Sequence, residues 1–115
     1  MRNKLILLLP FLVLGAVAAH AHASLDRASP RVGSTVRAAP REVTLWFSQK
    51  LEPSFSSAQV RDSAGARVDQ GAHVEGTVLH VPVKSLSAGT YRVHWRVLSV
   101  DIHTTEGNFT FRVGE

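Results

Sequence analysis

Asp101 and His103 are two metal-binding side chains separated by a single residue. In an extended segment, residues i and i+2 project from the same face of the chain, so this spacing would aim a carboxylate and an imidazole in one direction. Two ligands are too few for a specific metal site. We expect a further donor upstream, where His20 and His22 lie in the small-residue stretch AHAHAS.

Residues 1–21 have the composition of a secretory signal peptide. Arg2 and Lys4 give a basic start, an apolar run follows from Leu5 to Ala19, and small residues end it. The run is shorter than the roughly 18 to 20 residues that cross a bilayer. We therefore expect export with removal of residues 1–21, and a single domain over residues 22–115 that is not stably inserted in a membrane.

The cleavage point decides which histidine becomes the amino terminus. Cleavage after Ala21 makes His22 the first residue. Cleavage after Ala19 makes His20 first and His22 third, an arrangement that binds Cu(II) or Ni(II) by itself, whereas cleavage after Ala23 removes both histidines. Small residues precede the cuts after Ala21 and after Ala19, so both cleavage points are possible from the sequence. Cleavage after Ala21 is our working prediction.

A terminal histidine offers one metal two nitrogens, its α-amine and its ring Nδ1. An imidazole from His103 and a carboxylate oxygen from Asp101 would complete a set of three nitrogens and one oxygen. This set suits the tetragonal preference of Cu(II), with Zn(II) as the tetrahedral competitor. The chain has no cysteine, so it offers no thiolate ligand and no disulfide. The hypothesis is one Cu(II) per chain, bound by His22, Asp101 and His103.

Hydrophobic alternation predicts an all-β domain around these residues. Clear strand patterns cover 42–49, 77–83, 90–98 and 108–113, weaker ones cover 22–26, 57–62 and 67–70, and residues 71–76 are predicted as a loop. About seven short strands without helical periodicity indicate an antiparallel β-sandwich with Greek-key connections, the alternative being a small barrel. Asp101 and His103 fall in the connection between the last two strands.

Charge and motif patterns argue against other functions. The arginines are scattered singly rather than clustered with aromatic residues, which disfavours nucleic-acid binding. No nucleophile motif of a hydrolase is present. His80 and His94 are predicted to face outward from their strands and His73 to lie in the 71–76 loop, and all three favour ordinary surface positions over metal binding.

Several segments resemble the CopC family of periplasmic copper-binding proteins. They are residues 22–25 (HASL), 29–36 (SPRVGSTV), 39–40 (AP), 43–48 (VTLWFS), 86–103 (LSAGTYRVHWRVLSVDIH) and 106–111 (EGNFTF), in order over essentially the whole domain. The resemblance implies an immunoglobulin-like sandwich that binds Cu(II) through a histidine brace, in which the amino-terminal histidine binds through both its amine and its ring. Carried over by position, the ligands are His22, Asp101 and His103.

The resemblance also implies a role in copper tolerance or uptake, often together with an inner-membrane CopD protein, which here would be a separate polypeptide. Two features of this sequence depart from the pattern of that family and limit what the resemblance implies. The only methionine is Met1, so the methionine-rich Cu(I) site of some members is not expected. Gln49 stands where many relatives have a glutamate, so the groups around the terminal amine are expected to differ.

The expected function is a soluble periplasmic copper carrier or buffer that catalyses no reaction. One alternative is an oxygen-activating copper enzyme, since histidine braces also occur in such enzymes, but Asp101 would occupy coordination space that dioxygen needs. The other alternative is a partner-binding sandwich without metal, which would hold if cleavage left no terminal histidine.

Overall fold

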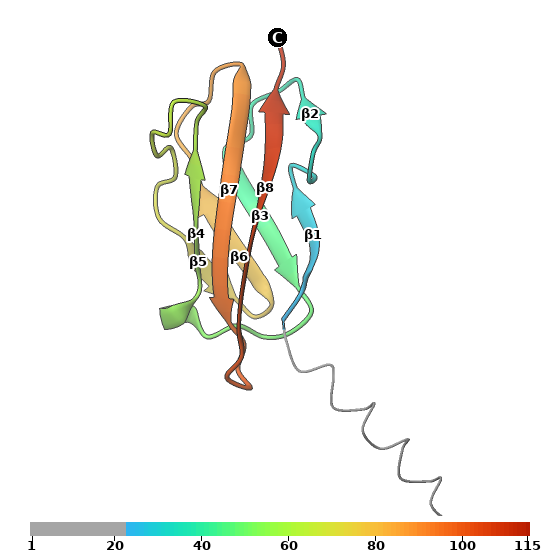
Figure 1. The fold of residues 1–115 in the computed structure, drawn as a ribbon, viewed down its shortest axis with the longest axis vertical. Helices are drawn as coiled ribbons and strands as arrows, with labels where there is room; N and C mark the ends of the chain where they lie inside the picture. The colour runs from blue at the N-terminus through green and yellow to red at the C-terminus, as the bar shows by residue number, and fades with distance from the viewer. Residues whose placement is uncertain (1–22) are drawn as a thin grey trace, which may run out of the picture.

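The computed structural model describes residues 23–115, which form two stacked β-sheets (Figure 1). The first sheet has the order β1-β3-β6-β5 and the second the order β2-β8-β7-β4. The strands are β1 (Leu25–Ser29), β2 (Thr35–Val36), β3 (Glu42–Phe47), β4 (Ser57–Arg61), β5 (His73–Glu75), β6 (Val78–Pro82), β7 (Gly89–Leu98) and β8 (Thr104–Val113). Neighbouring strands are antiparallel except β2 and β8. The predicted β-sandwich is confirmed.

Alternate residues of the long strands fill the space between the sheets. Trp95 of β7 meets Phe47 of β3 edge to face, with 5.1 Å between ring centroids, and this contact joins the two sheets. Tyr91 stacks on Phe111 of the neighbouring strand β8 at 5.5 Å. The alternation predicted for residues 90–98 is confirmed, because one set of side chains is buried: Tyr91, Val93, Trp95 and Val97.

Three strand predictions were wrong in their details. The first strand begins at Leu25 rather than at residue 22. Residues 67–70 form only isolated bridges, because the Asp69 side chain accepts the Val60 N–H at 2.9 Å in place of a backbone partner. Residues 71–76, predicted as a loop, contain β5, which exists through its pairing with β6. A strand of three residues is too short to show alternation in the sequence.

The hairpin of β7 and β8 sets the position of the predicted metal ligands. Its two strands pair without interruption from Gly89–Val113 to Leu98–Thr104. Residues 99–103 therefore project at one end of the sandwich, which is also the end where β1 begins (Figure 1). Within residues 23–115, no helix is both long and apolar enough to pass through a membrane.

Candidate metal centre

Asp101 and His103 lie in a tight turn at the tip of the β7–β8 hairpin. The Ile102 N–H donates to the Ser99 carbonyl at 2.8 Å, and the Ser99 N–H donates to the His103 carbonyl at 3.0 Å. Ile102 has a φ of 70°, a rare conformation for a β-branched residue. The expectation of an extended segment here was wrong, because these hydrogen bonds fold the chain back on itself.

The turn nevertheless brings the two side chains together. Asp101 Oδ1 lies 3.5 Å from His103 Nδ1. Both side chains are partly exposed, at 36% for Asp101 and 45% for His103, so a metal ion has access to both. The predicted proximity of carboxylate and imidazole is thus present, although it results from a turn and not from strand alternation.

Ser99 positions Asp101 and His103 through hydrogen bonds, and it was not among the site residues predicted from the sequence. Its side chain is fully buried, and its hydroxyl donates to Asp101 Oδ1 and accepts the His103 N–H at 3.3 Å. The Ser99 hydrogen bond lowers the pKa of Asp101; desolvation opposes this shift and His103 supports it. Asp101 therefore stays ionised, as a metal ligand must be. A serine directly after a buried strand and two residues before an acid was the available signal.

The chain enters the fold beside the same turn. Ala23 is fully buried, and its carbonyl accepts a hydrogen bond from the Thr105 hydroxyl at 2.9 Å. Thr105 follows His103 by two residues. Ser24 is fixed as well, because its N–H donates to the Ser48 hydroxyl at 2.9 Å. His22, the third predicted ligand, lies outside the described residues.

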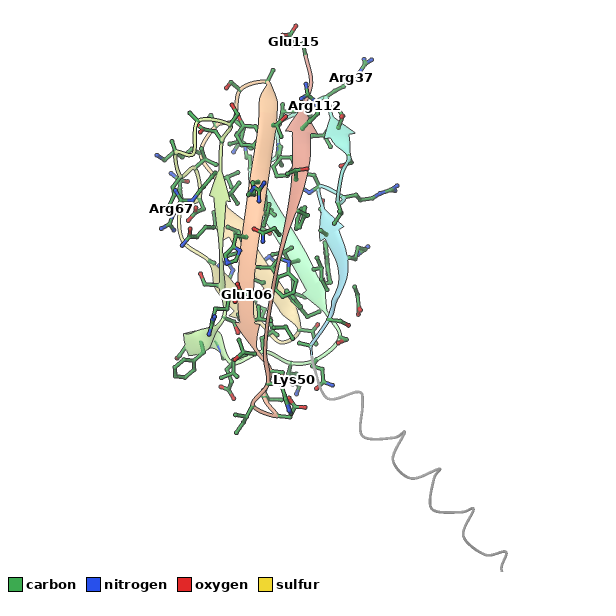
Figure 2. The ribbon with its side chains drawn as sticks, viewed as in Figure 1. Arg37, Lys50, Arg67, Glu106, Arg112 and Glu115 are labelled. Atoms are coloured by element: carbon green, nitrogen blue, oxygen red, sulfur yellow. The ribbon has the colours of Figure 1, made fainter. Side chains whose placement is uncertain are left out.

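Residues after β3 complete this end of the molecule. The Val100 N–H donates to the Lys50 carbonyl at 3.0 Å, which ties the turn to the segment that follows β3. Figure 2 shows Lys50 at this end of the sandwich. Gln49, at the position where the resemblance implied a glutamate, is the preceding residue and is half-buried. The turn is thus supported from both sheets.

The other histidines within residues 23–115 lie on the outer faces of the sheets. His80 of β6 and His94 of β7 face outward as predicted. His94 Nδ1 lies 3.1 Å from the Asn108 side-chain oxygen, and its Nε2 lies 3.6 Å from Glu106. The loop position predicted for His73 was wrong, because His73 begins β5 and is paired with His80.

Comparison with known proteins identifies the family of this chain. The sequence model of the CopC domain matches residues 25–114. Protein YobA of Escherichia coli (strain K12) is 37% identical, with 98% of this chain and 94% of that protein covered. Copper resistance protein C of Escherichia coli is 38% identical, with 89% and 90% covered. The crystal structure of CopC from Methylosinus trichosporium OB3b is similar with a TM-score of 0.77, at 38% identity over 81% of this chain and 94% of that one. The chain belongs to the CopC family.

Proposed function

We propose that this protein is a periplasmic Cu(II) carrier or buffer in copper homeostasis or resistance. One observation carries the proposal: the Asp101 carboxylate and the His103 imidazole meet within 3.5 Å beside the point where the chain enters the fold at Ala23. Family membership supports copper as the metal, since a relative of 38% identity is named copper resistance protein C.

The proposed ligands are His22, Asp101 and His103, with one Cu(II) per chain. Ala23, the residue that follows His22 in the sequence, is fixed by the hydroxyl of Thr105 in β8, and this fixed entry point supports His22 as the third ligand. Signal cleavage before His22 creates an α-amine. This amine and the ring of His22 supply two nitrogen ligands. Asp101 accepts from Ser99 through Oδ1, and Oδ2 is the oxygen that we assign to copper.

This ligand set favours storage and transfer over catalysis. Nitrogen and oxygen donors without sulfur suit Cu(II). A carboxylate from Asp101 occupies a coordination position that an oxygen-activating centre would need open. We therefore propose that the protein has no enzymatic activity.

Two exposed apolar side chains flank Asp101 and suggest how copper is passed on. Val100 is 48% exposed and Ile102 is 77% exposed, on the same turn as the proposed ligands. An apolar rim around a metal site suits brief docking to another protein. We propose that the docking partner is a separate inner-membrane transporter of the CopD type.

The proposal is tested on the full chain after export, with less than one equivalent of Cu(II). Intact mass should give a chain that begins at His22 and gains one copper. His103→Ala and Asp101→Ala should each weaken Cu(II) binding and change the electron paramagnetic resonance (EPR) spectrum, while His94→Ala, on the outer face of the second sheet, should do neither. Binding by His103→Ala with unchanged affinity and spectrum would overturn the ligand assignment.

A further inference from the structure

A second group of histidine and glutamate side chains, residue types that can bind metals, lies on the outer face of the first sheet. His80 of β6 is the centre of the group. His73 is its partner across the β5–β6 ladder, Glu75 lies two residues further along β5, and Glu42 approaches from β3 on the other side. None of these residues belongs to the β7–β8 turn, which extends from the other sheet.

His80 is held between two carboxylates. Its Nδ1 lies 2.7 Å from Glu42 Oε2, and its Nε2 lies 3.0 Å from Glu75 Oε1. Glu42 Oε2 also accepts the Thr44 hydroxyl at 2.7 Å. The His80 hydrogen bond is the main reason why the pKa of Glu42 is lowered, so Glu42 is an ionised acceptor. An ionised carboxylate only accepts hydrogen bonds, which places a proton on His80 Nδ1.

This arrangement prepares the other ring nitrogen to bind a metal. Histidines that bind metals commonly donate their second ring N–H to a carboxylate, which fixes the tautomer and the orientation of the ring. Glu42 makes that contact, and the His80 side chain is only 22% exposed, so the ring is already ordered. His80 Nε2 then points toward Glu75 on the solvent side.

The three remaining donors are close enough to share one ion. One ligand atom each from His73, Glu75 and His80 lies within 4.8 Å of the other two. Metal bonds of about 2.0 to 2.2 Å place ligand atoms about 3 to 3.5 Å apart, and the His80–Glu75 pair at 3.0 Å already has this spacing. The His73 ring stacks on His80 at 5.0 Å and must rotate. His73 is exposed on the edge strand β5, so its rotation displaces no core residue.

We propose that His73, Glu75 and His80 form a second metal site, which binds a divalent transition-metal ion, with Glu42 as a positioning residue. Two imidazoles and one carboxylate, completed by water, match the ligands of known Zn(II) sites, and the same nitrogen donors bind Cu(II) more strongly. The site shares no ligand with the proposed copper centre at Asp101 and His103. The second site should therefore bind Zn(II) when no other metal is present, or Cu(II) after the first equivalent has filled the copper centre.

The competing explanation is that a proton occupies the place of the metal. A doubly protonated His80 would donate to Glu42 and Glu75 at the same two distances. Zn(II) alone is the probe that separates the two cases, because it replaces the proton on Nε2 and has no paramagnetism. The test uses the full exported chain with Asp101→Ala and His103→Ala combined, so that the first centre keeps only His22 of its three proposed ligands.

Zn(II) titration of that chain by calorimetry should show one ion bound, and the ring ¹⁵N resonances of two histidines should shift on saturation. His73→Gln and Glu75→Gln should each lower the affinity by at least about tenfold, and Glu42→Gln by about tenfold. His94→Gln is the matched control, because His94 also lies on an outer strand face beside an acid, and it should leave the affinity unchanged. All four replaced side chains lie outside the core, and circular dichroism checks that each variant is folded.

Absence of Zn(II) binding, or equal binding by His73→Gln, Glu75→Gln and the parent, would overturn the second site. Neither result bears on the copper centre, which has lost Asp101 and His103, two of its three proposed ligands, in this background. Conversely, failure of the copper centre in its own test would leave the Zn(II) result unaffected.

Discussion

Replacement of Ser99 by alanine isolates the residue that organises the proposed copper centre. The side chain is fully buried, and it bridges the Asp101 carboxylate and the His103 N–H. Ser99→Ala removes both contacts without changing either proposed ligand. Loss of hydrogen-bonding groups around metal ligands typically costs 10- to 100-fold in affinity, roughly the decrease that we expect for Cu(II). Loss of the bond from the His103 N–H to the buried Ser99 hydroxyl should lower the free energy of unfolding by about 1 kcal/mol.

Ser56 provides a matched control at the same end of the molecule. It is also buried, and its hydroxyl accepts the N–H of Leu98, the residue before Ser99, at 3.1 Å. Ser56→Ala should therefore lower the free energy of unfolding by a similar amount, about 1 kcal/mol, and leave Cu(II) affinity unchanged. The two effects are separated by competition with a chromophoric chelator and by urea unfolding of the metal-free proteins.

The pH dependence adds a second signature. Ser99 lowers the pKa of Asp101, so in Ser99→Ala this pKa rises toward its usual range. Protons then compete with copper at higher pH than in the parent, and the affinity difference should widen on mild acidification. Equal Cu(II) affinity of Ser99→Ala and Ser56→Ala, or tighter binding by Ser99→Ala, would refute the positioning role.

Two further predictions concern the scaffold. A Cβ at Gly107 would lie 2.6 Å from Trp95 Cζ2, so Gly107→Ala should lower the free energy of unfolding by about 1 to 3 kcal/mol and alter the near-ultraviolet circular dichroism of the tryptophan; unchanged urea unfolding would contradict this. Burial raises the pKa of Asp69, but hydrogen bonds from Arg67 and the Val60 N–H outweigh it and lower the pKa in the folded state. The resulting stabilisation is present above the unfolded value of about 3.9 and is lost as pH falls through the lower folded value. Asp69→Asn should thus cost about 1 to 2 kcal/mol in urea unfolding at pH 7 and less at pH 3, and an equal cost at both would count against the ion pair.

The strands that could be predicted from the sequence are those with long alternation and buried partners. β7 extends over ten residues with every second side chain buried, so its pattern is strong. β5 has three residues and depends on the partner strand β6, and pairing between strands is not encoded in a local pattern. Regular alternation thus identified the sandwich but not its short edge strand β5.

The candidate sites could also be predicted from the sequence only in part. The spacing of Asp101 and His103 was readable, but the turn that joins them was not, because Ile102 adopts a conformation that local preference disfavours. Hydrogen bonds between Ser99 and His103 impose it. The cluster around His80 was missed because it depends on the register of three strands that are not all neighbours in the sequence.

The most direct test of the copper centre is to move the terminal amine and keep every side chain. One alanine inserted ahead of His22, with the new terminus verified by intact mass, leaves His22, Asp101 and His103 in the chain. At less than one equivalent of Cu(II), the parent should give the EPR spectrum of a tetragonal site with three nitrogens and one oxygen. The extended protein should lose that spectrum and bind copper more weakly. Identical spectra and affinities would contradict a centre built on the amine of His22.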